Sequence, residues 1–113
     1  MPAAQHNLGW MYANGKGVEK DPKEAVRWYL LAADQGYGAS QLNVGFIYAK
    51  GEAGGDVRGQ LVDAVKWFAL ASNSPDKSIS ETAKKAVVYV AQRQTPDILT
   101  DGMDQAKKWA YNH

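Results

Sequence analysis

An internal repeat is the feature that most constrains how this chain can fold. At an offset of 36 residues, the segment 3–15 aligns with the segment 39–51, and seven of the paired positions are identical. At an offset of 39 residues, the segment 25–32 aligns with 64–71, and the three extra residues are an insertion in the second connecting loop, 50–60. Short repeats of this kind bury their apolar faces only by stacking on one another, so the repeat predicts a solenoid.

Within each repeat, the apolar residues follow helical spacing. They form two faces of the i, i+3, i+4, i+7 type: Ala4, Leu8, Met11 and Tyr12 in the first segment, and Ala25, Trp28, Tyr29 and Ala32 in the second. Asp21 followed by Pro22 is typical of a helix start, and Gly36 is typical of a helix end. Each repeat is therefore predicted to be a helical hairpin.

The glycines predict connectors and close helix crossings. Residues 14–17 have the composition of a tight turn, whereas 50–60, with four glycines, should form a longer and more mobile connector. Gly9 and Gly45 lie inside helices, where glycine costs about 1 kcal/mol relative to alanine. We expect their bare backbone to receive a partner helix, with Trp28 or Trp67 lying against it.

The last 40 residues do not align with the repeat in the same way but are still helical. Residues 78–81 match a capping box, and an apolar stripe follows at Ala83, Ala86, Val87, Val90 and Ala91. Thr95 and Pro96 should start a final helix, with an apolar face at Leu99, Met103, Ala106 and Ala110. Gly102 is a further candidate for a close crossing. This helix pair is predicted to cap the solenoid.

These patterns predict one all-α domain over residues 1–113, an α/α superhelical solenoid. Repeat 1 covers 1–36, repeat 2 covers 37–73, and a degenerate third unit or cap covers 74–113. With 113 residues, 45% of them hydrophobic and 22% charged, the composition is that of one globular domain.

Composition also excludes several classes of function. The chain has no cysteine, which removes thiolate metal sites and cysteine nucleophiles, and its two histidines, His6 and His113, lie at opposite ends. A net charge of +1 provides no basic field for nucleic acid. The longest uncharged run, 36–49, is too short and polar for membrane insertion, and no export signal is recognisable. We expect a soluble protein without a cofactor, cytoplasmic by default, or periplasmic if a leader has been removed.

Two segments, 22–33 and 39–48, together with Gly15-Lys16-Gly17-Val18 between the helices, resemble the Sel1-like repeat, a relative of the tetratricopeptide repeats. The first repeat is similar to the family pattern along nearly its full length, and the second departs from it over 52–60. The helix from Thr95 to Trp109 is similar to the one that often closes bacterial members.

The resemblance implies an adaptor or scaffold that binds a protein or peptide on its concave side. It places a groove along first-helix positions, here Ala3, His6, Trp10, Ala13, Leu42, Phe46 and Ala49. Trp10 and Phe46 are large enough to anchor a peptide, and His6, Asn7 and Asn43 could hold its backbone amides. The alternative is that both aromatics simply pack against neighbouring helices.

Two other functions are compatible with the sequence. The chain could be a structural segment of a longer or self-associating solenoid, because repeat stacks usually need about three units, and the N-terminal repeat face would then meet another protomer. It could also be a β-lactam-binding or hydrolase-like enzyme, since Ser74 and Lys77 have Ser-x-x-Lys spacing. The companion Ser-Asp-Asn and Lys-Thr-Gly patterns are absent, and Ser74-Pro75 has turn chemistry.

Smaller motifs have structural interpretations. Gly15-Lys16-Gly17 lacks the spacing of a phosphate-binding loop. Five basic residues near the C-terminus are better explained as the solvated faces of two helices than as a binding patch: Lys84, Lys85, Arg93, Lys107 and Lys108.

Overall fold

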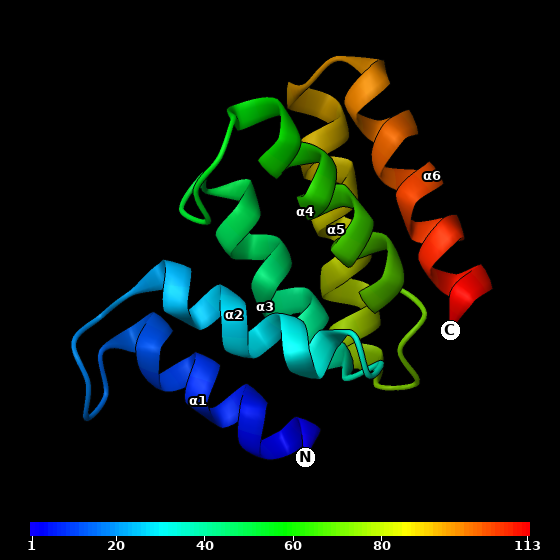
Figure 1. The fold of residues 1–113 in the computed structure, drawn as a ribbon. Coiled ribbons are helices and arrows are strands. Elements are labelled where there is room, and N and C mark those ends of the chain that lie inside the picture. Colours follow the sequence, from blue (N-terminus) through cyan, green and yellow to red (C-terminus); the bar gives the residue numbers. More distant parts are fainter.

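The computed structural model covers residues 1–113 and contains six α-helices and no strand (Figure 1). This confirms the all-helical fold predicted from the repeat. The helices are α1 (Pro2–Asn14), α2 (Pro22–Ala33), α3 (Gly38–Ala49), α4 (Val57–Ala71), α5 (Lys77–Arg93) and α6 (Pro96–Asn112). α1 and α2 lie together at one end of the molecule, and α6 lies at the other (Figure 1). No helix is both long and apolar enough to cross a membrane.

The ends of α2 are as the sequence predicts. The Asp21 side chain accepts a hydrogen bond from the backbone N–H of Glu24 at 3.2 Å, and Pro22 occupies the first turn, where its missing N–H costs nothing. Beyond the helix, Gly36 adopts φ 86°, a left-handed conformation that favours glycine. The following N–H, of Tyr37, then bonds back to the carbonyl of Ala32 at 3.2 Å.

The second connector is shorter than predicted, because α4 begins at Val57 and not after Gln60. The Asp56 carboxylate accepts a hydrogen bond from the N–H of Gly59 at 2.9 Å, which starts the helix despite the glycine. Gln60 is buried, and its side-chain amide accepts from the N–H of Ala53 and donates to the carbonyl of Gly55, at 3.0 and 3.1 Å. The side chain of Gln60 therefore holds the glycine-rich loop in place.

The helical glycines lie at close crossings, but the aromatic partners differ from the prediction. A Cβ placed on Gly9 would lie 2.7 Å from Cδ1 of Tyr29, and one on Gly45 would lie 2.6 Å from Cε1 of Phe68. The expected partners, Trp28 and Trp67, are each one residue earlier. One residue turns a helix by about 100°, so the tryptophans point away from the crossing.

The start of α5 corrects the predicted capping box. Helix α5 begins at Lys77, and Asp76 is the capping residue, since its carboxylate accepts from the N–H groups of Ser78 and Ile79 at 2.9 and 3.4 Å. Ser78 is already inside the helix. Along the predicted apolar stripe of α5, Ala83, Ala86 and Val90 are buried, Val87 is half-buried and Ala91 is exposed.

The buried face of α6 is rotated by one residue from the predicted one. Ile98, Gly102 and Ala106 are buried, whereas Leu99 is only half-buried, and Met103 and Ala110 are exposed. Gly102 explains the shift, because a Cβ there would meet Cβ and Cγ1 of Val65 and lie 2.9 Å from the carbonyl oxygen of Val62. The bare backbone of Gly102 lets α6 lie directly against α4, and this contact sets the rotation of the helix.

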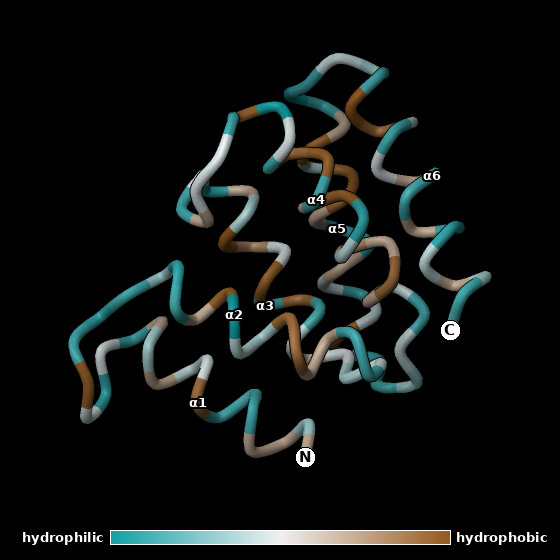
Figure 2. The backbone as a smooth tube through the Cα atoms, viewed as in Figure 1, coloured by the Kyte–Doolittle hydropathy of each residue, from teal (hydrophilic) through white to brown (hydrophobic).

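One apolar core joins all the helix pairs. Its buried members include Tyr29 of α2, Val44 of α3, Trp67 of α4 and Ala106 of α6. The apolar segments of α2, α3 and α4 lie toward the middle of the molecule, whereas the connectors are mostly hydrophilic or of intermediate hydropathy, apart from a short apolar stretch between α1 and α2 (Figure 2). Phe68 centres a second cluster with Val90 of α5 and Ile98 of α6, to which Val62, Ala64, Val65 and Ala86 also belong.

The C-terminal end of α6 returns to the first hairpin. The Trp109 indole N–H donates to the Asp34 carboxylate at 2.8 Å, and a ring nitrogen of His113 lies 3.1 Å from the same oxygen. The rings of Trp109 and His113 stack with centroids 3.9 Å apart, and Trp109 meets Trp67 edge-on at 6.0 Å. Residues 75 or more positions apart in the sequence are thus in direct contact.

Candidate partner-binding face

The first helices of the pairs, α1, α3 and α5, line one side of the molecule, which we call the first-helix face. Two hollows open on it. The first, of about 290 Å³, lies between α1 and α3, and the second, of about 470 Å³, lies between α3 and α5. Two residues line both hollows and therefore lie at their boundary: Phe46 of α3, and Lys50, which follows the last residue of that helix.

Four predicted groove residues meet in the first hollow: Trp10, Ala13, Asn43 and Phe46. Trp10 is 44% exposed and Phe46 is 37% exposed, so a large part of each aromatic side chain stays in contact with water. The ring of Phe46 also packs edge-on against Phe68, with centroids 5.1 Å apart. Phe46 therefore has a fixed aromatic neighbour and still keeps 37% of its surface exposed.

Asn43 supplies a polar group beside these aromatics. Its side-chain N–H donates to the hydroxyl of Tyr29 at 3.3 Å, and its carbonyl oxygen forms no hydrogen bond. Burial raises the pKa of Tyr29, so this phenol stays protonated. Asn43 thus retains an acceptor at the edge of the first hollow, the kind of group that receives a peptide N–H.

His6 has a different environment from the one predicted. Its Nδ1 lies 2.7 Å from the Ser40 hydroxyl, and its ring lies between Tyr29 and Tyr37, with centroids 5.3 and 5.2 Å away. Burial lowers the pKa of His6 below its ordinary value, which favours the neutral ring. His6 joins the first hairpin to the second and lines neither of the two hollows.

The other predicted groove residues are scattered. Ala3 and Asn7 are exposed and lie outside both hollows, and Leu42 is half-buried against the second apolar cluster. Ala49 lines the second hollow. The structure thus brings together part of the predicted set and spreads the rest along α1 and α3.

Sequence reasoning missed the part of this face that α5 contributes. The second hollow is lined by five residues of α5, for which the sequence predicts only a capping role: Thr82, Lys85, Ala86, Tyr89 and Val90. The sequence does contain a signal for this surface. Tyr89 is a large aromatic residue that lies beside the apolar stripe of α5 and not within it.

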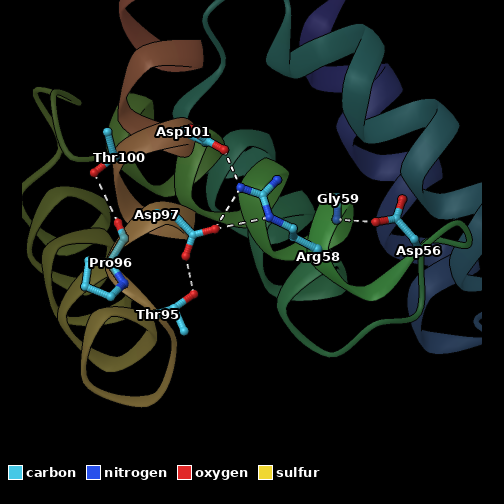
Figure 3. A network of polar contacts seen from close by, with 8 residues as sticks. All are labelled: Asp56, Arg58, Gly59, Thr95, Pro96, Asp97, Thr100 and Asp101. Atoms are coloured by element: carbon cyan, nitrogen blue, oxygen red, sulfur yellow. Dashed lines mark hydrogen bonds and ion pairs between the residues drawn. The ribbon is translucent and has the colours of Figure 1, made fainter.

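The polar network on another part of the surface is structural in character (Figure 3). Arg58 at the start of α4 contacts the carboxylates of Asp97, at 2.9 Å, and of Asp101 on α6. The Thr95 hydroxyl donates to Asp97, and this bond together with Arg58 lowers the pKa of Asp97. All these charged groups are well exposed, so the network braces α4 against α6 with little stabilising effect.

Two further side chains with shifted pKa values, Tyr48 and Asp63, lie on α3 and α4. Burial raises the pKa of Asp63, and burial together with the charge of Asp63 raises the pKa of Tyr48 to about 12. No group of three or more acidic or histidine side chains is arranged to hold a metal ion.

The candidate catalytic pair lies in a connector. The Ser74 hydroxyl accepts a hydrogen bond from the N–H of Asp76 at 3.2 Å, and Lys77 is the first residue of α5. No hydrogen bond joins Ser74 to Lys77. The Ser-x-x-Lys geometry requires both residues to lie on one helix. Ser74 instead lies in the turn before the helix that Lys77 begins.

Comparison with known families decides the class of this fold. The Sel1 repeat pattern matches residues 2–37 and 38–76, which correspond to the α1–α2 and α3–α4 hairpins with their flanking turns. The chain belongs to the Sel1 repeat family. Sel1 repeats are helical hairpins that typically form protein-interaction surfaces.

The similar proteins are all longer than this chain. A protective antigen present in uropathogenic Escherichia coli strains, which displays an SLR fold, superposes on 98% of this Sel1 chain with a TM-score of 0.82 and 29% identity. A Sel1 repeat protein from Oxalobacter formigenes covers 96% of the chain with a TM-score of 0.65 and 32% identity. A sel1-like repeat-containing protein, L21, of Acanthamoeba polyphaga mimivirus is 44% identical over 45 residues, or 40% of the chain. The chain spans 22%, 44% and 8% of their respective lengths.

Proposed function

We propose that this Sel1 chain is a non-enzymatic interaction module that binds a peptide or a partner helix across its first-helix face. The observation that carries the proposal is the pair of partly exposed aromatic residues, Trp10 and Phe46, which line one hollow together with the free acceptor of Asn43. Aromatic side chains at a concave surface are typical anchors of protein interfaces, because they bury a large area with few rotatable bonds.

Peptide titration followed by amide chemical shifts tests this function. Peptides that bind should shift the resonances of Trp10, Ala13, Asn43 and Phe46, and Trp10→Ala should weaken binding by about tenfold or more, the scale of an interface hot spot. Tyr111→Ala is the matched control, since Tyr111 is an exposed aromatic residue on α6, away from this face. Shifts confined to other helices, or equal losses in both variants, would contradict the proposal.

The outer side of α1 supports a second candidate function, stacking onto another copy of the chain. Leu8 and Val44 occupy the same repeat position, yet Leu8 is 36% exposed and Val44 is fully buried. Gln41, on α3, donates to the carbonyl of Ala33 at the end of α2, whereas its repeat partner Gln5 bonds only the side chain of Gln35. The positions that pack against the preceding hairpin in repeat 2 are thus partly exposed to solvent at the equivalent places on α1.

Sedimentation over a wide concentration range tests this second candidate. Self-association through α1 predicts a concentration-dependent mass that Leu8→Lys abolishes. Val88→Lys, on the exposed side of α5, should leave the mass unchanged. A chain that stays monomeric at high concentration would exclude stacking of copies and leave the peptide-binding function in place.

A further inference from the structure

We infer that the hollow between α3 and α5 takes an acidic peptide segment, with a large apolar side chain in the hollow and carboxylates at Lys50 and Lys85. This inference rests on the proposed function, and it adds the chemical class of the ligand. Within the first-helix face, it assigns this ligand to the hollow that α5 lines, a part of the face that the sequence alone did not predict.

The interior of this hollow is apolar. Phe68, 1% exposed, forms its floor, and Ala86 and Val90 of α5 are buried beside it. Phe46 on α3 and Tyr89 on α5, 37% and 59% exposed, are its large surface residues. The volume of about 470 Å³ lies within the range of roughly 300–1,000 Å³ that is typical of ligand pockets. A leucine or phenylalanine side chain would bury area here that water now covers.

The charged residues that line the hollow are all positive. Lys50 and Lys85 are the only charged residues among the nine that line it, and neither is part of an ion pair. Glu81, one turn before Lys85 on α5, does not pair with it. The aliphatic stem of a lysine can cover an apolar surface while its ammonium group stays in water, so both residues suit the rim of such a site.

Arg93 adds a third positive charge next to the rim. Its guanidinium carbon lies 3.7 Å from the centroid of the Tyr89 ring. This cation–π contact restrains the tyrosine and brings the charge close to the hollow. An apolar interior surrounded by unpaired cations complements a segment whose apolar side chain is flanked by aspartate or glutamate, and it disfavours a basic one.

An array of short peptides tests this inference. Each peptide carries a central Leu-Phe pair, flanked by Asp and Glu in one series, by Asn and Gln in the second, and by Lys in the third. We expect the acidic series to bind about tenfold more tightly than the amide series, and added salt to reduce the difference because it screens exposed charges. The strongest peptide of each series is then measured in solution by fluorescence anisotropy.

Matched variants locate the binding. Lys50→Gln and Lys85→Gln should each weaken the acidic peptide by about two- to fivefold, the scale of a partly exposed ion pair. Lys84→Gln removes the same charge from a neighbouring position outside the hollow and should have no effect. Tyr89→Ala should weaken all three series, whereas Val88→Ala should not. Circular dichroism confirms that each variant keeps its helices.

Reversing both charges provides the decisive comparison. The double variant Lys50→Glu, Lys85→Glu should prefer the lysine series. Equal binding of the acidic and amide series, or equal effects of Lys84→Gln and Lys85→Gln, would overturn the inference. Peptide binding that depends on Trp10 but ignores both lysines would overturn it while supporting the proposed function. Absence of binding in all three series would contradict both.

Discussion

Gly102→Ala offers a direct measure of how tightly α6 is packed on α4. Two effects oppose each other. Alanine stabilises a helix interior by about 1 kcal/mol relative to glycine. Against this gain, the new methyl group would overlap the branched side chain of Val65 at its Cβ and lie 2.9 Å from the backbone oxygen of Val62. Neither of these groups can move aside as the end of a long, flexible side chain could.

The steric effect should prevail. Overpacking a close contact typically costs 1–3 kcal/mol, and a clash that includes backbone belongs at about the upper end of that range. The net loss of unfolding free energy is therefore about 2 kcal/mol. For a domain of 113 residues, this corresponds to a fall in Tm of about 8 °C, at about 4 °C per kcal/mol.

Thermal and urea unfolding followed by circular dichroism provide the measurement. The helix-propensity term is calibrated on the same helix by comparing Gln105→Gly with Gln105→Ala, because Gln105 is exposed in the middle of α6. A Gly102→Ala variant as stable as the wild type, or more stable, would refute the conclusion that the bare backbone of Gly102 sets the spacing between α4 and α6.

Three further predictions concern polar groups. Asp76→Ala should destabilise the protein by about 1 kcal/mol because it removes the cap of α5. Ser78→Ala should change the unfolding free energy by less than about 0.5 kcal/mol. Equal effects of the two substitutions would support the capping box that begins at Ser78. Gln60→Ala should cost about 1–2 kcal/mol and speed hydrogen exchange at the Ala53 amide, since two loop groups lose their partners. The lowered pKa of His6 means that unfolded His6 takes up a proton first as the pH falls through about 6.5, so stability should decline from pH 7.5 to 5. His6→Gln should flatten that decline in Tm, and an unchanged slope would assign it to other groups.

The repeat allowed most of the fold to be predicted from the sequence. Identical glycines at Gly9 and Gly45 marked the two helix crossings, and Asp21 marked the start of α2, because each of these signals is local. The face of α6 was predicted wrongly because it depends on a tertiary contact, that of Gly102 with Val65. The start of α4 was predicted too late for a local reason: the glycines of the connector indicated a loop, whereas the Asp56 cap already starts the helix at Val57.

The candidate site was predicted only in part because it, too, depends on tertiary contacts. The resemblance to related repeats places Trp10 and Phe46 just outside the packing face of their helices, and both are partly exposed in the structure. The resemblance could not show that His6 pairs with Ser40, since that contact depends on the angle between two hairpins. Nor could it bring Tyr89 close to Phe46, because α5 departs from the repeat and its placement has no internal template.

The contact of Trp109 and His113 with Asp34 has a consequence for cooperativity. In an open array of repeats, each unit touches only its neighbours, so the ends can unravel while the middle stays folded. Here the last helix touches the first hairpin, and one core runs through every helix pair, so losing any unit removes contacts from the other two. Denaturation should thus be a single all-or-none transition, with the N- and C-terminal helices losing amide protection at the same denaturant concentration.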